Sequence, residues 1–335
     1  MRKTIPARVA RAFLVLSLAL CASGAAFAQQ VVKIATLAPD GSAWMRELRI
    51  AAADVQTATA GRVQVKYYPG GVMGSDTVVL RKIRLGQLQG GVLTSSELAA
   101  QYPDAQIYSM PFLFDSWDQL ERARVQVDPL LAKGFEAKGF KMLTPANVGF
   151  AYLMSARPLR NRADFMAAKL WIPQNDMIAE RTFKAGGVSP ILLPLGDVFT
   201  SLQTGLVDTV ANTPAGAVAL QWHGKLHTML DFPLSFVVGF VVMDLKAFDK
   251  IAPADQAVVM KAFRAAGTRV DAGIRRDDAA ALAAMKKQGL QVVPMPPAEA
   301  VRWRQIGAQV TREMEADHSV SSAALAASRK AAGGH

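Results

Sequence analysis

The chain has 335 residues, of which 51% are hydrophobic, and it carries a formal net charge of +11 at neutral pH. Basic residues alternate with acidic ones, as where Arg275-Arg276 precedes Asp277-Asp278. Because nucleic-acid-binding surfaces show clustered charge, this scatter predicts a solvated surface and excludes nucleic acid from the expected partners.

The first 28 residues predict a secretory signal peptide. Four basic residues precede an apolar run over residues 12–28, which ends on Ala-Phe-Ala, as is typical of an export signal. The run is short and interrupted for a membrane span. A lipoprotein anchor on Cys21 is the alternative, but it needs a small residue before the cysteine, and Leu20 stands there. We expect cleavage after Ala28 and a periplasmic mature protein.

Removal of this segment lowers the formal charge to +7 and removes Cys21, the only cysteine. The mature chain then has no disulfide, thiolate metal ligand or cysteine nucleophile. It must be stabilised by core burial alone, and its length favours two lobes over one core.

Strand and helix patterns alternate from residue 31 onward. A first unit has strands at 31–37, 63–67 and 90–94, with one helix capped by Ser42 and another at 76–85. A second unit has strands at 169–172, 190–195 and 206–211, with helices at 176–185 and 197–204. Each βαβαβ unit predicts a parallel sheet with crossover helices. Two such units in one exported chain predict an α/β protein of two lobes that face each other across a cleft.

The remaining chain predicts connecting elements. Residues 236–243 form a continuous apolar run, expected to be a strand that crosses between the lobes. A long helix is expected from Pro253 towards Met285, and another at 301–314. The tail after Ser319 is rich in alanine and serine, and we expect it to be frayed.

Two turns place helix N-termini near strand ends, where open parallel sheets bind ligands. They are residues 39–42 and 173–176. Unpaired N–H groups and the positive end of the helix dipole suit an anion or a polar head group. Ordinary helix capping is an equally good interpretation of both turns.

Longer stretches of the sequence resemble a known family. These are residues 59–75 (TAGRVQVKYYPGGVMGS), 107–120 (IYSMPFLFDSWDQL), 196–214 (GDVFTSLQTGLVDTVANTP) and 249–256 (DKIAPADQ). In this order and spacing they are similar to the solute receptors of tripartite ATP-independent periplasmic (TRAP) transporters, of the dicarboxylate-binding (DctP) type.

The resemblance implies a two-lobed periplasmic binding protein fold with hinge strands and a long C-terminal helix. Lobe I would comprise residues 29–148, lobe II 149–235, a return to lobe I with the connecting helix 236–274, and C-terminal helices with a frayed tail 275–335. It also implies a monomer without a cofactor, which closes on a small organic solute and delivers it to a membrane permease.

The sequence departs from the family where an organic acid is usually held. The family arginine in a K-[LI]-R-[VI]-P strand is replaced by Trp171, and a second arginine, in a G-[FT]-R stretch, by Ala151. Asn212 matches an asparagine that commonly contacts the ligand. A dicarboxylate held by two arginines is therefore not expected, and Arg157 or Arg181 could replace the lost cation, although no spacing places either in the cleft.

We interpret Trp171 as a pocket wall that stacks on an apolar, cyclic or cationic ligand face; the alternative is that it fills the volume of the lost arginine. Asn175 and Asp176 could bind hydroxyls or an ammonium, although for Asp176 a simple role as a negative charge at its helix N-terminus is the better interpretation. The candidate ligand-binding residues are Trp171, Asn212, Phe150, Leu195, Asn175, Asp176 and Trp44.

Other motifs do not favour an enzyme. His223 and His227 have the four-residue spacing of helical metal ligands, but no third ligand is evident, and a surface helix is the better interpretation. No G-x-S-x-G, P-loop or dinucleotide motif occurs. An exported enzyme and a sensor that presents its ligand to a membrane signalling protein are the alternatives to transport, and the sequence does not separate sensing from transport.

Overall fold

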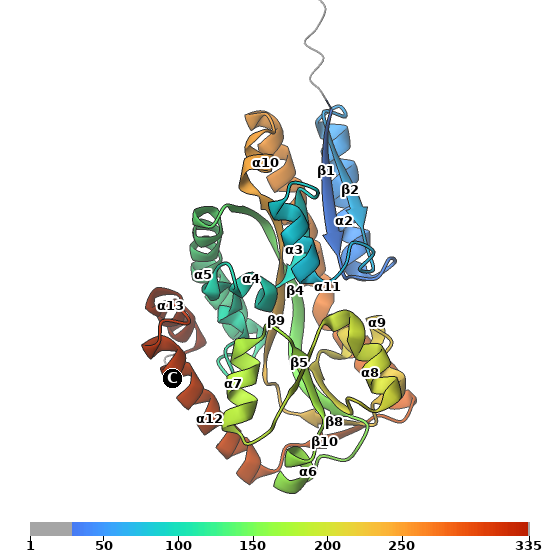
Figure 1. Cartoon of the computed structure of the whole chain (residues 1–335), viewed down its shortest axis with the longest axis vertical. Coiled ribbons are helices and arrows are strands. Elements are labelled where there is room, and N and C mark those ends of the chain that lie inside the picture. The colour runs from blue at the N-terminus through green and yellow to red at the C-terminus, as the bar shows by residue number, and fades with distance from the viewer. Residues whose placement is uncertain (1–28, 334–335) are drawn as a thin grey trace, which may run out of the picture.

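The computed structural model describes residues 29–333, so the predicted signal peptide lies outside the described residues. The fold is α/β (Figure 1). The strands are β1 Gln30–Thr36, β2 Val63–Tyr68, β3 Gly90–Thr94, β4 Phe140–Ser155, β5 Leu170–Pro173, β6 Ile191–Leu193, β7 Thr209–Asn212, β8 Thr228–Asp231, β9 Ser235–Asp244 and β10 Gln291–Pro294. The α-helices are α2 Ala43–Ala58, α3 Asp76–Arg84, α4 Ser95–Ala99, α5 Trp117–Ala137, α6 Arg162–Met166, α7 Met177–Ala185, α8 Val198–Thr204, α9 Pro214–Ala219, α10 Leu245–Asp249, α11 Pro253–Lys287, α12 Pro297–Ala316 and α13 Ser322–Ala332. The 3₁₀-helices are η1 Pro103–Ser109, η2 Leu195–Asp197 and η3 His223–Lys225.

The two predicted βαβαβ units are confirmed. In the first, β1 lies between β2 and β3 and runs parallel to both. In the second, β5 lies between β6 and β7, again parallel to both. The strand order is β2-β1-β3-β9-β4-β7-β5-β6, with β8 beside β4 and β10 beside β8. The carboxyl ends of the central strands β1 and β5 therefore each precede a helix, α2 and α7, as expected for crossover units.

Two long antiparallel strands join the units. β9, the predicted apolar strand, pairs with β4 from Phe140↔Asp244 to Ala151↔Ser235, while the end of β4 pairs with β7. β4 was not predicted from the sequence. The ladder shifts register between Met142 and Thr144 and again between Asn147 and Gly149, and such bulges bend a strand and increase its twist. β4 thus runs from one unit into the other at an irregular point.

The predicted long helix is confirmed as α11, and it covers this junction. It begins with Pro253, whose missing N–H costs nothing in the first turn, and it contacts α2, β4 and α9. Gly267 allows a close approach to β4, since an added Cβ would lie 2.2 Å from Thr144 Oγ1. Helix α12 then contacts α7, and α13 contacts α5, the red helices beside the green ones in Figure 1.

The prediction of a frayed tail after Ser319 was wrong. Ser321 caps α13 by accepting the Ala324 N–H at 3.2 Å. Asp104 anchors this cap, because its carboxylate accepts both the N–H of Ser321 at 2.6 Å and its hydroxyl at 2.7 Å. Leu325 is fully buried. The alanines and serines that suggested a loose tail are small residues that let α13 pack closely on the protein.

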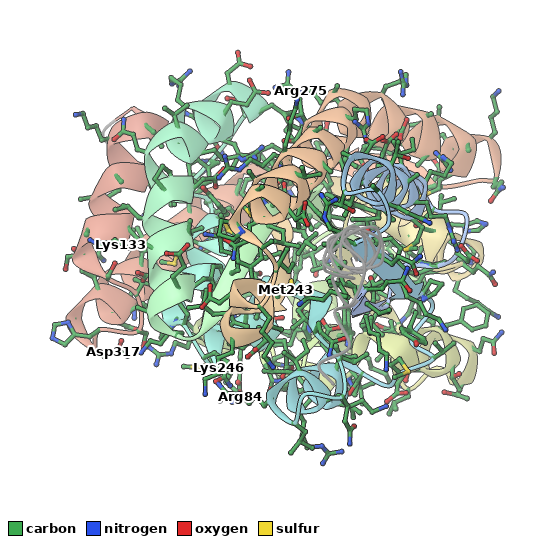
Figure 2. The ribbon with its side chains drawn as sticks, turned by 90° about the horizontal axis from the view of Figure 1, so that it is seen from above. Arg84, Lys133, Met243, Lys246, Arg275 and Asp317 are labelled. Carbon is green, nitrogen blue, oxygen red and sulfur yellow. The ribbon has the colours of Figure 1, made fainter. Side chains whose placement is uncertain are left out.

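Charged side chains lie around the outer helices. In the view from above (Figure 2), Arg84, Lys133 and Arg275 lie on α3, α5 and α11, at separate places on the surface. Within residues 29–333, no helix combines the length and apolar character needed to span a membrane.

The buried position of Leu325 gives a test of the folded C-terminus. Leu325→Ala should lower the free energy of unfolding by about 2–5 kcal/mol, because it removes a buried side chain and leaves a cavity. Chemical denaturation measures the change. Leu206→Ala, at a leucine that is 51% exposed, is the control and should change the free energy of unfolding little. Equal, small effects of both substitutions would contradict a packed α13.

Candidate functional site

An apolar cavity of about 210 Å³ lies between the two units. Its walls come from the end of β3 and the start of α4, from β5, α7 and β7, from β9, and from α12. A cavity of roughly 150 Å³ holds a benzene ring, so this one has room for a single ring with substituents. A wider groove of about 660 Å³, lined by Pro39, Gly71 and Leu220 among others, adjoins it.

Trp171 and Ala151, the positions where the family pattern has arginines, both line the cavity. Trp171 is 2% exposed and its ring packs edge-to-face on Trp222, with the centroids 5.3 Å apart. Its indole N–H donates to the Leu193 carbonyl at 3.0 Å. Because this donor is already used, Trp171 offers the cavity apolar surface only.

Asn212 and Asp176 also line the cavity. Asn212 ends β7, and its Oδ1 accepts the Thr213 N–H at 2.8 Å, so its amide nitrogen is the group it can offer a ligand. Asp176 caps α7 by accepting the Ala179 N–H at 2.9 Å. Burial raises the pKa of Asp176 to about 6, although the hydrogen bonds to its carboxylate act in the opposite direction.

Leu195 lines the same cavity, whereas Phe150 and Asn175 are not part of its lining. Phe150 packs edge-to-face on Trp117 and Phe236, with centroid distances of 5.5 and 5.4 Å. Asn175 reaches across to the first unit, where its Nδ2 donates to Glu97 Oε2 at 2.7 Å.

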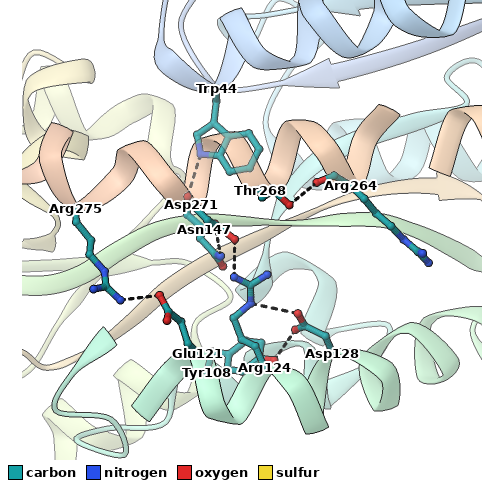
Figure 3. Close-up of polar contacts among 10 residues, drawn as sticks. All are labelled: Trp44, Tyr108, Glu121, Arg124, Asp128, Asn147, Arg264, Thr268, Asp271 and Arg275. Carbon is teal, nitrogen blue, oxygen red and sulfur yellow. Dashed lines mark hydrogen bonds and ion pairs between the residues drawn. The ribbon is translucent and has the colours of Figure 1, made fainter. Parts of the chain in front are cut away.

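Trp44 lies in a polar network away from the cavity lining (Figure 3). Its indole N–H donates to the Asn147 carbonyl at 3.0 Å, at the second register shift of β4. The Asn147 side-chain amide donates to Asp271 of α11 at 2.7 Å, and Arg124 of α5 donates to the same carboxylate at 2.6 Å. Arg124 also contacts Asp128, which accepts a hydrogen bond from Tyr108 at 2.5 Å. The network therefore ties α2, α11 and α5 to the bent part of β4.

Three cavity-lining features were not predicted. Phe112 has a φ of 55°, which is strained for a side-chain-bearing residue; its PFLF motif supported the family resemblance without a site role. Ser95 and Ser96 add hydroxyls at the start of α4. Trp303 comes from α12, and its indole N–H has no hydrogen-bond partner among the described residues. No sequence signal links Trp303 to the cleft, because it lies 91 residues beyond Asn212, the last residue of the second unit's strands.

Basic residues do not replace the missing arginines. Arg157 pairs with Asp208, and Arg181 with Asp317 at 2.5 Å, and neither lines the cavity. Among the described residues, the lining of the cavity includes no lysine or arginine. The charged groups at the cleft are carboxylates: Asp176, and beside the cavity Asp76 and Glu97.

The prediction of a surface helix that carries His223 and His227 was wrong. His223 begins the short 3₁₀-helix η3, and His227 directly precedes β8. The preceding helix α9 ends at Ala219, and the chain turns through Gln221, whose φ is 62°. Residues 29–333 bring together no group of three or more histidine, cysteine, aspartate or glutamate side chains suited to a metal.

Comparison with known proteins agrees with this geometry. The bacterial extracellular solute-binding protein family 7 matches residues 34–317. The C4-dicarboxylate-binding periplasmic protein of Rhodobacter capsulatus is 26% identical over 263 residues, which cover 76% of this chain and 78% of that protein.

Two solved structures share the fold. A TRAP periplasmic solute binding protein from Desulfovibrio salexigens, with bound orotic acid, matches with a TM-score of 0.79 and 22% identity, over 91% of this chain and 94% of its own. An extracytoplasmic solute receptor from Bordetella pertussis that binds pyroglutamic acid matches with a TM-score of 0.83 and 21% identity, over 90% and 99%.

The buried carboxylate of Asp76 predicts a pH dependence. Burial, with a smaller effect of Glu97, raises the pKa of Asp76 to about 6. The folded protein therefore keeps this proton at pH values where the unfolded chain has lost it, so stability falls as the pH rises from about 4 to about 6. Between these pH values, the free energy of unfolding of the wild type should fall by up to about 3 kcal/mol relative to that of Asp76→Asn. Chemical denaturation at several pH values measures the difference, and the exposed Asp54→Asn serves as control. Parallel curves for wild type and Asp76→Asn would contradict the raised pKa.

Proposed function

Because the chain belongs to bacterial extracellular solute-binding protein family 7, the solute receptors of TRAP transporters, we propose that it binds a small organic solute between its lobes and delivers it to a TRAP-type permease. Proteins of this family are periplasmic receptors and not enzymes. We further propose that the receptor is a monomer released by cleavage after Ala28, with lobes at 29–148 and 149–235 and a return to lobe I over 236–274.

The observation that carries the proposal is the apolar cavity between the two units. It lies at the carboxyl ends of the parallel strands, where sheets of this kind bind ligands. Walls contributed by both units mean that a solute would contact both only when they are close together, and such contacts favour a closed state. This arrangement suits a receptor that captures and releases its ligand.

The lining restricts the class of solute. Orotate and pyroglutamate, which two structural neighbours bind, are organic acids built on one ring. We propose for this protein a solute with an apolar, ring-sized body against Trp171 and Leu195, and one polar or anionic end that meets the amide of Asn212. A second carboxylate on the solute would be unfavourable, because residues 29–333 contribute no basic side chain to the lining and contribute the carboxyl group of Asp176.

Substitution of Trp171 tests the apolar wall. Trp171→Ala should weaken solute binding by at least about 1 kcal/mol, or roughly fivefold in Kd, because the ring's contact surface is lost. Isothermal titration calorimetry measures the change. Leu206→Ala, at an exposed leucine outside the lining, is the control and should leave the Kd unchanged. An unchanged Kd in Trp171→Ala would remove Trp171 from the site.

The solute class is tested by thermal shift of the protein purified from the periplasm. The panel contains monocarboxylates, dicarboxylates, sugars, aromatic acids and zwitterions. A solute at a thousand times its Kd should stabilise the protein by about 4 kcal/mol and raise the melting temperature clearly. We expect the shift from single-ring monocarboxylates or zwitterions. A strong shift from dicarboxylates would contradict the proposed restriction, and no shift from any class would contradict solute binding.

A further inference from the structure

A second, smaller cavity of about 50 Å³ adjoins the main one. The two share Thr94, Ser96, Pro173 and Leu195 in their linings. A water molecule occupies about 30 Å³ in the liquid, so the smaller cavity has room for one polar group the size of an ammonium. It is therefore a side pocket of the proposed solute site.

Two buried carboxylates line this side pocket. Asp76, at the start of α3, is 7% exposed, and Glu97, in α4, is 6% exposed. Neither forms a salt bridge with a described residue. Burial of a carboxylate without a cation lowers the free energy of unfolding, because the charge loses its hydration. Two neighbouring buried carboxylates lower it further, because they also repel each other.

The hydrogen bonds to one of these carboxylates, that of Asp76, are incomplete. Oδ2 of Asp76 accepts the Thr94 N–H at 2.9 Å, whereas its Oδ1 is buried and has no partner among the described residues. Oε2 of Glu97 accepts the Thr77 hydroxyl at 3.0 Å and the Asn175 amide at 2.7 Å. Buried polar atoms are nearly always paired, so an unpaired one in a native protein needs an explanation.

A structural role does not account for Asp76. As the first residue of α3 it suits the helix dipole, but a dipole does not require burial or an unpaired oxygen. Its bond to Thr94 uses one oxygen, which an asparagine would also provide. The second oxygen is thus left for a donor that comes from outside the chain.

We propose that Asp76 and Glu97 form a subsite for a protonated amine of the bound solute. This rests on the proposed function and narrows it: the solute carries a cationic nitrogen as well as its ring-sized body. The nitrogen enters the side pocket and donates to Asp76 Oδ1, while its positive charge offsets the two carboxylates. A negatively charged group is excluded from this pocket by the same carboxylates.

The subsite lies where the two units meet. Asn175 donates to Glu97, and Gln174 Nε2 donates to Thr77 Oγ1 at 3.1 Å, so both residues of the β5–α7 turn reach the first unit. An amine held by Asp76 and Glu97 is therefore enclosed by contacts between the units. Binding at the side pocket would favour the closed arrangement, because these contacts exist only when the units are close.

Matched pairs of small ring compounds test the subsite. The amine probes are piperidine-3-carboxylate and benzylammonium, and the matched acids are cyclohexanecarboxylate and benzoate respectively. We expect the wild type to bind the amine probes at least about tenfold more tightly than the acids, as hydrogen bonds to charged groups predict. Isothermal titration calorimetry at pH 7 gives each Kd.

Asp76→Asn and Glu97→Gln should each weaken binding of the amine probes by about tenfold or more while keeping the side-chain shape. The exposed Asp54→Asn removes one charge far from the cleft and should leave each Kd unchanged. Melting curves show whether each variant is folded. If Asp76→Asn does not fold, the binding affinities of Glu97→Gln alone test the subsite.

Tighter binding of the acids, or amine affinities unchanged in the folded variants, would overturn the subsite and leave the proposed function intact. So would solutes of the wider panel that bind while every amine probe fails. If the wild type binds none of the wider panel either, the proposed solute binding is overturned together with the subsite.

Discussion

The antiparallel ladder between β4 and β9 holds the two parallel units in one molecule, and the cavity depends on it. β4 pairs with β9 beside the first unit and with β7 of the second. Its register shift between Asn147 and Gly149 falls where the chain passes from one unit to the other. A regular ladder would continue the sheet without a bend, whereas a bulge turns the strand. The bend allows walls from both units to face one cavity.

The polar network at this bend explains the position of Trp44. The indole and the Asn147 carbonyl, and then Asp271 and Arg124, connect three helices to the irregular backbone of β4. An irregular strand leaves backbone groups without ladder partners, and buried groups of this kind need other partners. Trp44 satisfies one of them and so supports the bent strand, whereas it is not part of the cavity lining to which Trp171 belongs.

The cleft of this chain differs in charge from one that holds its ligand with arginines. Trp171 and Ala151 remove positive charge from the lining, and Asp76, Glu97 and Asp176 leave negative charge beside it. Buried carboxylates lower stability, since desolvation disfavours their charged form. A binding protein that retains such groups accepts lower stability at its site, which is where local rules of folding are most often broken.

The sequence by itself determined the two βαβαβ units, the cap at Ser42, the strand at β9 and the helix α11. These features depend on periodicity and on neighbours a few residues apart, which a sequence displays directly. It did not reveal β4, α5 or α13. Pro145 and Gly149 interrupt the strand pattern of β4, Pro129 and Gly134 interrupt the helix pattern of α5, and small residues hide α13. Only the tertiary structure decided that Trp303 reaches the cavity, that Phe150 packs on Phe236 outside the lining, and that Asp76 and Glu97 share a side pocket. Such positions depend on contacts between distant segments, and one-dimensional periodicity contains no information on those contacts.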